Sequence, residues 1–136
     1  MKIAHIAFKS TIEGGETVLI NLVLGMRKAG HQLYVIAPEE GPLVDLMQEN
    51  GIETEIIPLR HIWEISTARQ LARFIDSQGI NLVQSHGKIV NILTRIAMFF
   101  VKRKPICIAT EHNPLRLKHG GHESAHKAKA CFYRYI

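Results

Sequence analysis

Short apolar runs alternate along the chain with longer segments in which hydrophobic residues recur every three or four positions. Five of the short runs have the length and the continuous hydrophobicity of strands buried on both faces. Pro58 lies near the end of the third run and places that strand toward an edge of the sheet or at a bulge. The predicted strands are Ile3–Phe8, Gln32–Ala37, Ile52–Leu59, Ile80–Ser85 and Pro105–Thr110.

The segments between these runs have the periodicity of amphipathic helices. Pro42 stands at a favoured first helical position, Ser66 is expected to cap a helix, and glycines follow several of the segments as stop signals. The last helix before the fifth strand is expected to turn Phe100 inward. The predicted helices are Glu16–Lys28, Pro42 up to Gly51, Ser66 up to Gly79 and Lys88–Lys102, and Ser124–Ile136 is predicted to begin a fifth.

Strict alternation of strand and helix, with continuously apolar strands, predicts an α/β fold: a doubly wound, Rossmann-like parallel sheet with helices on both faces. The 136 residues have the length of one ordinary domain. A doubly wound domain normally adds a further strand after the last predicted helix. We therefore expect residues 1–136 to be a truncated amino-terminal domain.

The composition is that of a globular protein of the cytoplasm. Hydrophobic residues make up 46% of the chain, and the two cysteines give no disulfide framework. The start of the chain reads as a strand and not as a signal peptide. The longest apolar region, Ile89–Val101, contains Asn91, Thr94 and Arg95, which argues against a membrane span.

The net charge of +5 is unevenly distributed along the chain. Residues 1–58 hold four Lys and Arg against eight Asp and Glu, whereas residues 59–136 hold thirteen against four. A basic half of this kind attracts phosphorylated ligands, anionic lipid headgroups or nucleic acid. The alternative interpretation is a solvated helix surface with no ligand.

Three polar segments directly follow predicted strands, at the edge where parallel sheets bind ligands. They are 9–16, 85–88 and 111–117. In the first, Gly14 and Gly15 leave a helix start without side chains, so that a phosphate can approach the backbone N–H groups. The segment matches neither the dinucleotide fingerprint nor the P-loop, and an ordinary tight turn is the alternative.

A histidine follows each of the last two predicted strands. His86 lies between a strand and Gly87, and we expect its ring in the crevice. His112 is placed to hydrogen-bond a substrate hydroxyl or phosphate, and Glu111 to orient that histidine or a sugar hydroxyl. The alternative is that both are polar residues at strand ends.

The run His122-Glu123-Ser124-Ala125-His126 satisfies the H-E-x-x-H zinc pattern. It follows two glycines and would therefore sit at a helix start. The residues after it offer no obvious third ligand, and so short a pattern arises by chance in a chain with eight histidines. We expect no metal site.

Five segments in order resemble one family. They are MKIAHIAF, GGETVLINLVLGMRKAGHQLYVIAP, GPLVDLMQENGIETEIIPL, INLVQSHG and PICIATEHN. From Met1 to about His112 the chain resembles the amino-terminal domain of retaining glycosyltransferases of the GT-B architecture, group 1 or GT4 type. The resemblance implies an acceptor-side half whose donor-binding partner domain lies outside this sequence.

The implied reaction is sugar transfer from a nucleotide-sugar to a glycan or lipid-linked acceptor, with retention and without a required metal or cofactor. Such enzymes serve cell-envelope polysaccharide synthesis. We expect a cytoplasmic protein, peripheral at an anionic membrane, with no nucleic-acid partner. The resemblance assigns His112 as catalytic, Gly14 and Gly15 to the donor phosphates, and Glu16, His86 and Glu111 to substrate binding.

Three other functions remain open. A nucleotide-sugar epimerase shares the two-domain architecture. A non-catalytic receiver domain would need acidic residues after the first strand and an Asp after the third, where Lys9-Ser10 and Leu59-Arg60 stand instead. A metalloprotease fragment would use His122, Glu123 and His126.

Overall fold

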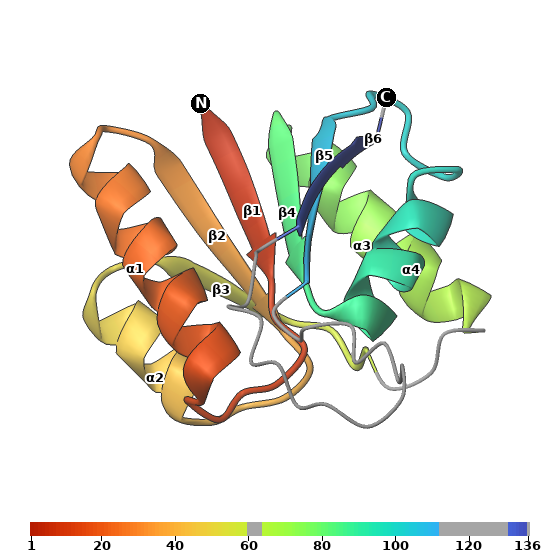
Figure 1. Cartoon of the computed structure of the whole chain (residues 1–136). Helices are drawn as coiled ribbons and strands as arrows, with labels where there is room; N and C mark the ends of the chain where they lie inside the picture. Colours follow the sequence, from red (N-terminus) through yellow and green to blue (C-terminus); the bar gives the residue numbers. More distant parts are fainter. Residues whose placement is uncertain (60–63, 112–130, 136) are drawn as a thin grey trace, which may run out of the picture.

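One six-stranded sheet runs through the computed structural model, which describes residues 1–59, 64–111 and 131–135 (Figure 1). The strand order is β3-β2-β1-β4-β5-β6. All pairings among the first five strands are parallel, and β3 lies at one edge, which confirms both predictions. The strands are β1 Lys2–Ile6, β2 Gln32–Ala37, β3 Glu53–Ile56, β4 Leu82–His86, β5 Ile106–Glu111 and β6 Cys131–Tyr135.

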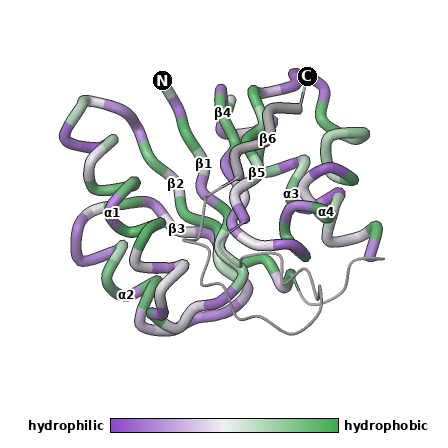
Figure 2. The backbone as a smooth tube through the Cα atoms, in the orientation of Figure 1, coloured by the Kyte–Doolittle hydropathy of each residue, from purple (hydrophilic) through white to green (hydrophobic). Residues whose placement is uncertain are grey.

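Two helices cover each face of the sheet, as predicted for a doubly wound fold. On one face, Ile3 and Ala7 pack with residues of α1 and α2; on the other, Ala4 and Ile6 pack with residues of α3 and α4. This alternation follows from the two-residue period of a strand. Hydrophobic and hydrophilic stretches alternate along the helices (Figure 2). The helices are α1 Gly14–Lys28, α2 Pro42–Glu49, α3 Ile65–Gln78 and α4 Lys88–Ala97.

Helix α4 ends at Ala97 and not at Lys102, which corrects the predicted boundary. The amides of Phe99 and Phe100 donate to carbonyls three residues earlier (3.1 and 2.9 Å), which tightens the chain into turns. Phe100 was predicted to face inward; it is 38% exposed, and the Arg69 guanidinium lies 5.1 Å from its ring centroid. The helical spacing of hydrophobic residues in the sequence continues beyond Ala97, although the backbone leaves the helix there. The prediction followed this spacing and therefore placed the end of the helix too late.

The start of α3 also differs from the prediction. The helix begins at Ile65, with Glu64 at the N-cap position, so Ser66 lies inside the first turn and does not cap it. The Glu64 carboxylate instead accepts a hydrogen bond from the Thr67 hydroxyl (2.9 Å).

The predicted helix over Ser124–Ile136 is wrong for residues 131–135, which form β6, antiparallel to β5. The edge of β5 presents backbone N–H and C=O groups that a further strand can pair. Phe132, Tyr133 and Tyr135 belong to the residue types enriched in strands. Pairing with the sheet edge therefore prevails over the local helical pattern.

One titratable side chain lies in the middle of the core. His5 is in β1, the central strand, and its side chain is fully buried. Burial lowers the pKa of His5 to about 4, because the charged imidazolium loses its hydration there. The ring is therefore neutral in the folded protein at pH 7.

We predict that His5 makes the stability of the fold depend on pH. Its folded pKa lies below the ordinary value of 6.5, so protons bind the unfolded chain more readily. This contribution to the free energy of unfolding is complete above pH 6.5 and is lost, up to roughly 3 kcal/mol, as the pH falls toward 4. Urea unfolding across this range should show the loss in the wild type and a smaller loss in His5→Asn. The matched control His31→Asn should keep the full loss; equal pH dependence in all three proteins would contradict the prediction.

Candidate functional site at the carboxyl edge of the sheet

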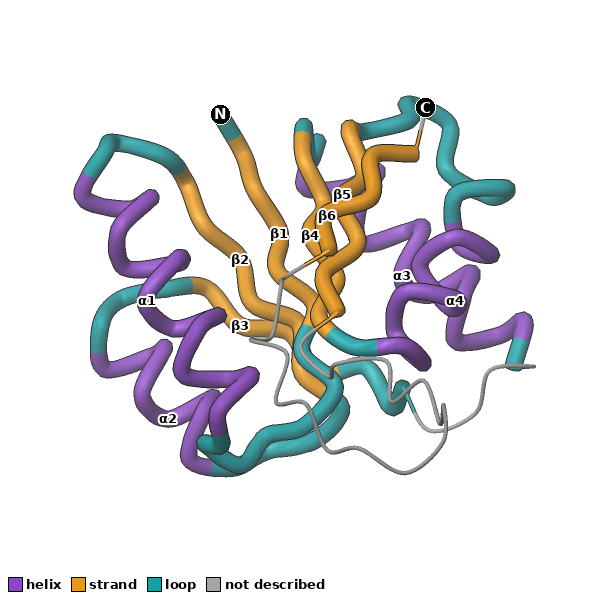
Figure 3. The backbone as a smooth tube through the Cα atoms, in the orientation of Figure 1, coloured by secondary structure: helices purple, strands orange, loops and turns teal. Residues whose placement is uncertain are grey.

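The three segments expected to carry chemistry all begin at one edge of the sheet. Parallel pairing brings the carboxyl ends of β1, β4 and β5 together, with the helix starts of α1 and α4 beside them (Figure 3). The chain leaves β1 toward β2 on one side and returns as β4 on the other. Ligands of doubly wound sheets bind at such a reversal.

The loop after β1 is fixed to the loop after β2. Ser10 is buried, and its hydroxyl donates to the backbone oxygen of Glu39 (2.5 Å). The Ser10 carbonyl accepts from the amide of Leu43 (2.9 Å). A Cβ at Gly41 would lie 3.0 Å from Cβ of Ser10, so the close approach of the two loops requires glycine there. The loop that precedes α1 is thus positioned by the fold.

The first turn of α1 carries no side-chain cap. Glu13 occupies the N-cap position, but its carboxylate is paired with the Lys9 ammonium (3.0 Å) and does not bond to the helix. Gly14 is exposed, Gly15 and Glu16 are half-buried, and a Cβ at Gly14 would meet no atom within 4 Å. No side chain of the described residues caps the amides at this helix start, where an anion is favoured.

The end of β4 lies next to the loop after β1. A Cβ at Gly87 would lie 3.5 Å from Cβ of Phe8, and the Gly87 amide donates to the carbonyl of Thr110 (2.9 Å). Gly87 has a φ of 110°, which L side chains rarely adopt. The predicted segments after β1 and β4 are therefore brought together.

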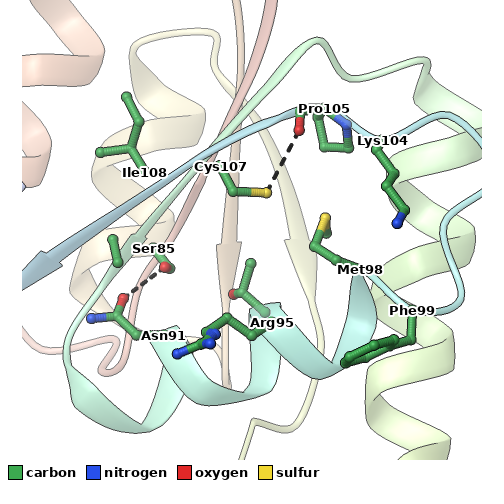
Figure 4. Close-up of a pocket in the computed structure, with 11 residues that line it drawn as sticks. Ser85, Asn91, Arg95, Met98, Phe99, Lys104, Pro105, Cys107 and Ile108 are labelled. Atoms are coloured by element: carbon green, nitrogen blue, oxygen red, sulfur yellow. Dashed lines mark hydrogen bonds between the residues drawn. The ribbon is translucent and has the colours of Figure 1, made fainter. Parts of the chain in front are cut away.

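Ser85 and His86 point to opposite faces of the sheet. The Ser85 hydroxyl donates to the side-chain oxygen of Asn91 (2.6 Å; Figure 4), and the Asn91 amide nitrogen lies 3.4 Å from the Thr110 carbonyl. With the amide turned so that its nitrogen faces β4, it would instead donate to the Ser85 hydroxyl and to the Ser85 or Gly87 carbonyl. These contacts hold the turn from β4 into α4. Asn91 was not among the predicted site residues, because an Asn inside an amphipathic helix gives no distinctive signal.

The ring of His86 lies beneath the surface of the edge. His86 is 5% exposed, and its Nε2 lies 3.1 Å from Nδ1 of His5. Beside this pair, Gln84 donates to the hydroxyl of Thr110 (2.9 Å), and both side chains are buried. The sequence signal for His5 was present: it is the single polar residue in the apolar run IAHIAF.

The end of β5 contributes Glu111, which is half-buried and pairs in register with Cys131 of β6. His112, the predicted catalytic residue, lies outside the described residues. The same holds for the H-E-x-x-H run at 122–126. Within residues 1–59, 64–111 and 131–135, no group of three His, Cys, Asp or Glu side chains could hold a metal ion.

A cavity of about 270 Å³ lies on the other face, between α4 and β5 (Figure 4). Ser85 and Cys107 line it from the sheet, Arg95 and Met98 from the helix, and Lys104 from the connection. Burial raises the pKa of the Cys107 thiol, so the thiol stays protonated and is a poor nucleophile. Among the described residues, none of the predicted site residues Gly14, Gly15, Glu16, His86 and Glu111 lines this cavity.

None of the helices in the described part of the chain is long and apolar enough to span a membrane. Comparison with curated protein sequences gives no match.

Several solved structures share the fold at low sequence identity. MurG of Acinetobacter baumannii has a TM-score of 0.65 at 12% identity, over 82% of this chain and 35% of that one. HepE of Anabaena in complex with UDP has a TM-score of 0.69 at 17% identity, over 88% and 32%. The lipopolysaccharide outer core galactosyltransferase WaaB has a TM-score of 0.64 at 14% identity, over 82% and 33%. The chain spans about a third of each of these proteins.

The fold alone does not assign a function, because glycinamide ribonucleotide transformylase 1 of Symbiobacterium toebii matches it with a TM-score of 0.62 at 14% identity, over 88% of this chain and 55% of that one. The fold is shared by glycosyltransferases and by this transformylase, but the sequence distinguishes between the two kinds of protein. The profile of Glycosyltransferase Family 4 matches residues 12–136, nearly the whole chain, from the loop before α1 to the last residue. The chain therefore belongs to Glycosyltransferase Family 4.

Proposed function

We propose that this chain is the amino-terminal, acceptor-side half of a GT-B glycosyltransferase that transfers a sugar from a nucleotide-sugar to an acceptor with retention of configuration. The observation that carries the proposal is the family match over residues 12–136. The two-domain arrangement is supported by the solved glycosyltransferases, of which this chain spans about a third. A nucleotide-sugar donor is supported by the HepE structures, which contain UDP and UDP-glucose.

We assign the donor diphosphate to the start of α1. The negative phosphate oxygens would accept hydrogen bonds from the amides around Gly14 and Gly15, where the helix dipole is positive. In the same loop, the ammonium group of Lys9 pairs with the carboxylate of Glu13 and partly balances the negative charge of that carboxylate. Preorganised donors of this kind stabilise the charge that develops on the leaving diphosphate, and no metal is required for that role.

We assign the acceptor to the part of the carboxyl edge between the first turn of α1 and the ends of β4 and β5. Glu16 in the first turn of α1 and Glu111 at the end of β5 are half-buried carboxylates that can accept hydrogen bonds from sugar hydroxyls. His86 is assigned to substrate binding at the end of β4, and His112 is the proposed catalytic residue. The acceptor is a glycan or a lipid-linked sugar of the cell envelope, a class that matches the lipopolysaccharide substrate named for WaaB.

A membrane contact is proposed at the connection between α4 and β5. Phe99 is 84% exposed there, and the side chains of Lys102, Arg103 and Lys104 are exposed beside it. Exposed aromatic and basic side chains favour the interface of an anionic bilayer. The enzyme would then act in the cytoplasm, peripheral to the membrane that carries its acceptor.

We predict metal-independent transfer by the complete enzyme and none by residues 1–136 alone. With a nucleotide-sugar donor, an envelope-glycan acceptor and a chelator, the complete enzyme should release the nucleotide and form a glycosylated product. Mass spectrometry of the products separates transfer from epimerisation, which would interconvert the nucleotide-sugar and leave the acceptor unchanged. Turnover by residues 1–136 alone, or zinc-dependent activity of the complete enzyme, would refute the proposal.

A second prediction concerns the methyl group that Gly14→Ala adds to the start of α1. The added Cβ meets no protein atom within 4 Å, so the melting temperature should not fall. If the phosphates bind to the backbone amides at this helix start, the added methyl group should hinder their approach. The KM for the nucleotide-sugar should then rise about tenfold, equivalent to about 1.4 kcal/mol of lost binding free energy. Gly25→Ala, also unobstructed and on the same helix, is the matched control and should leave KM unchanged. Equal KM values for the two variants would place the diphosphate elsewhere.

A further inference from the structure

The cavity between α4 and β5 contains a buried hydroxyl without a partner. Thr94 lies in α4 and lines the cavity. It is 3% exposed, and its Oγ1 has no hydrogen-bond partner among the described residues. Most buried side-chain oxygens in proteins are hydrogen-bonded, and an unpaired one destabilises the fold. A polar ligand atom in the cavity would supply the missing partner.

The chain around the cavity is basic. From Leu82 to Thr110 it holds five Lys and Arg and no Asp or Glu. Lys104 is exposed and enters the lining from the connection between α4 and β5, whereas Arg95 is exposed and enters it from the helix (Figure 4). The described residues that line the cavity include no carboxylate. A ligand group with negative charge is therefore favoured there.

The connection that carries Lys104 is fixed to the neighbouring helix. The carboxylate of Asp76 in α3 accepts a hydrogen bond from the backbone N–H of Lys102 (3.2 Å). The guanidinium of Arg69, also in α3, lies 5.1 Å from the ring centroid of Phe100. Because the backbone on either side of the cavity mouth is held in this way, little order has to be created when a ligand binds.

Most of the remaining lining is apolar, and the cavity is small. Met98 and Phe99 line it from the end of α4, and Pro105 and Ile108 line it from the side of β5. Its volume of about 270 Å³ corresponds to about nine non-hydrogen atoms, at roughly 30 Å³ for each, the volume of one water molecule in the liquid. A phosphate group takes five of these and leaves room for about four carbons. The cavity therefore suits a phosphate and the start of one apolar chain, and not the branched glycerol of a two-chain lipid.

We propose that this cavity binds the phosphate ester of a single apolar chain, with the phosphate between Thr94 and Lys104 and the chain along Met98 and Phe99. The Thr94 hydroxyl donates a hydrogen bond to a phosphate oxygen, and the Lys104 ammonium balances the negative charge. The first carbons of the chain contact the apolar side chains and leave the cavity beside Phe99, which is 84% exposed.

The position of the cavity suits a lipid-linked acceptor, an identification that rests on the proposed function. Ser85 and Asn91 line one end of the cavity, and Lys104 and Phe99 line the other (Figure 4). Ser85 directly precedes His86 at the carboxyl edge, whereas Lys104 and Phe99 belong to the proposed membrane contact. A sugar attached to the bound phosphate would extend toward the carboxyl edge, and the chain would extend toward the bilayer.

The test is the binding of geranyl phosphate to the complete protein, measured by titration calorimetry below its micelle-forming concentration and without vesicles. Thr94→Val should weaken binding about tenfold, the effect of one hydrogen bond to a charged group. It removes an unpaired hydroxyl, so its melting temperature should not fall. Thr94→Ser keeps the hydroxyl and should bind as the wild type does. Equal affinities of the wild type and Thr94→Val, or no binding at all, would overturn the proposal.

A second pair of variants tests the charge at an exposed position, where the fold is not at risk. Lys104→Gln should weaken the binding of geranyl phosphate about threefold, as expected for an exposed ion pair. Lys102→Gln removes the same charge two residues away from a side chain that does not line the cavity, and it should leave the affinity unchanged. Equal effects of the two variants would mean that the ligand responds only to the general charge of the connection, which would contradict the proposed site.

Three further ligands identify the chemistry that the cavity recognises. Inorganic phosphate lacks the chain and geraniol lacks the phosphate, so each should bind at least about tenfold more weakly than geranyl phosphate. Dihexanoylphosphatidylglycerol has a branched glycerol and two chains, and it should also bind more weakly. Geraniol or the phospholipid binding as tightly as geranyl phosphate would overturn the proposal.

The cavity and the proposed function fail separately, because binding is measured without catalysis. If the complete protein transfers no sugar but binds geranyl phosphate with this pattern of variants, only the identification of the ligand as an acceptor is lost. If it transfers sugar and Thr94→Val binds geranyl phosphate like the wild type, the cavity proposal is wrong and the proposed function remains.

Discussion

The parallel pairing of β1 with β4 is the contact on which the arrangement of the molecule depends. With β2 on its other side, β1 becomes the central strand at which the path of the chain reverses. The reversal sends α1 and α2 to one face and α3 and α4 to the other. Asn81 helps to fix this reversal. Its side-chain oxygen accepts a hydrogen bond from the backbone N–H of Lys2 (2.8 Å), and its backbone N–H donates to the Lys2 carbonyl (2.8 Å). The Asn81 carbonyl accepts from the backbone N–H of Ile106 (2.9 Å). These bonds align three strands at their amino ends, and the register carries that alignment to the carboxyl edge.

The polar residues inside the sheet gather near that edge. His5 with His86, and Gln84 with Thr110, form two buried hydrogen-bonded pairs across three adjacent strands. Buried polar groups destabilise a protein unless they are hydrogen-bonded, so apolar side chains at these positions would not need such partners. Both pairs lie under the loops after β1 and β4, next to the proposed acceptor side.

The sequence predicted the parts of the structure that local pattern determines. The five parallel strands and the edge position of β3 follow from continuous apolar runs and from Pro58. It did not predict β6, because the strand character of residues 131–135 depends on an available edge of β5. Nor did it identify His5: a histidine in an apolar run has no visible partner until the register places His86 beside it. Gly14 and Gly15 were predicted as phosphate-binding residues because a glycine pair at a helix start is a local signal; α1 begins at Gly14 itself and not at Glu16, as the sequence had suggested.

The central place of β1 has a consequence for synthesis on the ribosome. The first strand to emerge pairs with a segment that lies 79 residues later, as the bond between Lys2 and Asn81 shows. Until then β1, β2 and β3 can assemble with α1 and α2, but the opposite face of this half-sheet, with Ala4, Ile6 and Ile36, lacks its helices. At about 5–20 residues per second, translation leaves this apolar face and the free edge of β1 uncovered for seconds. A nascent chain with such a surface is a natural client for chaperones that bind near the ribosomal exit.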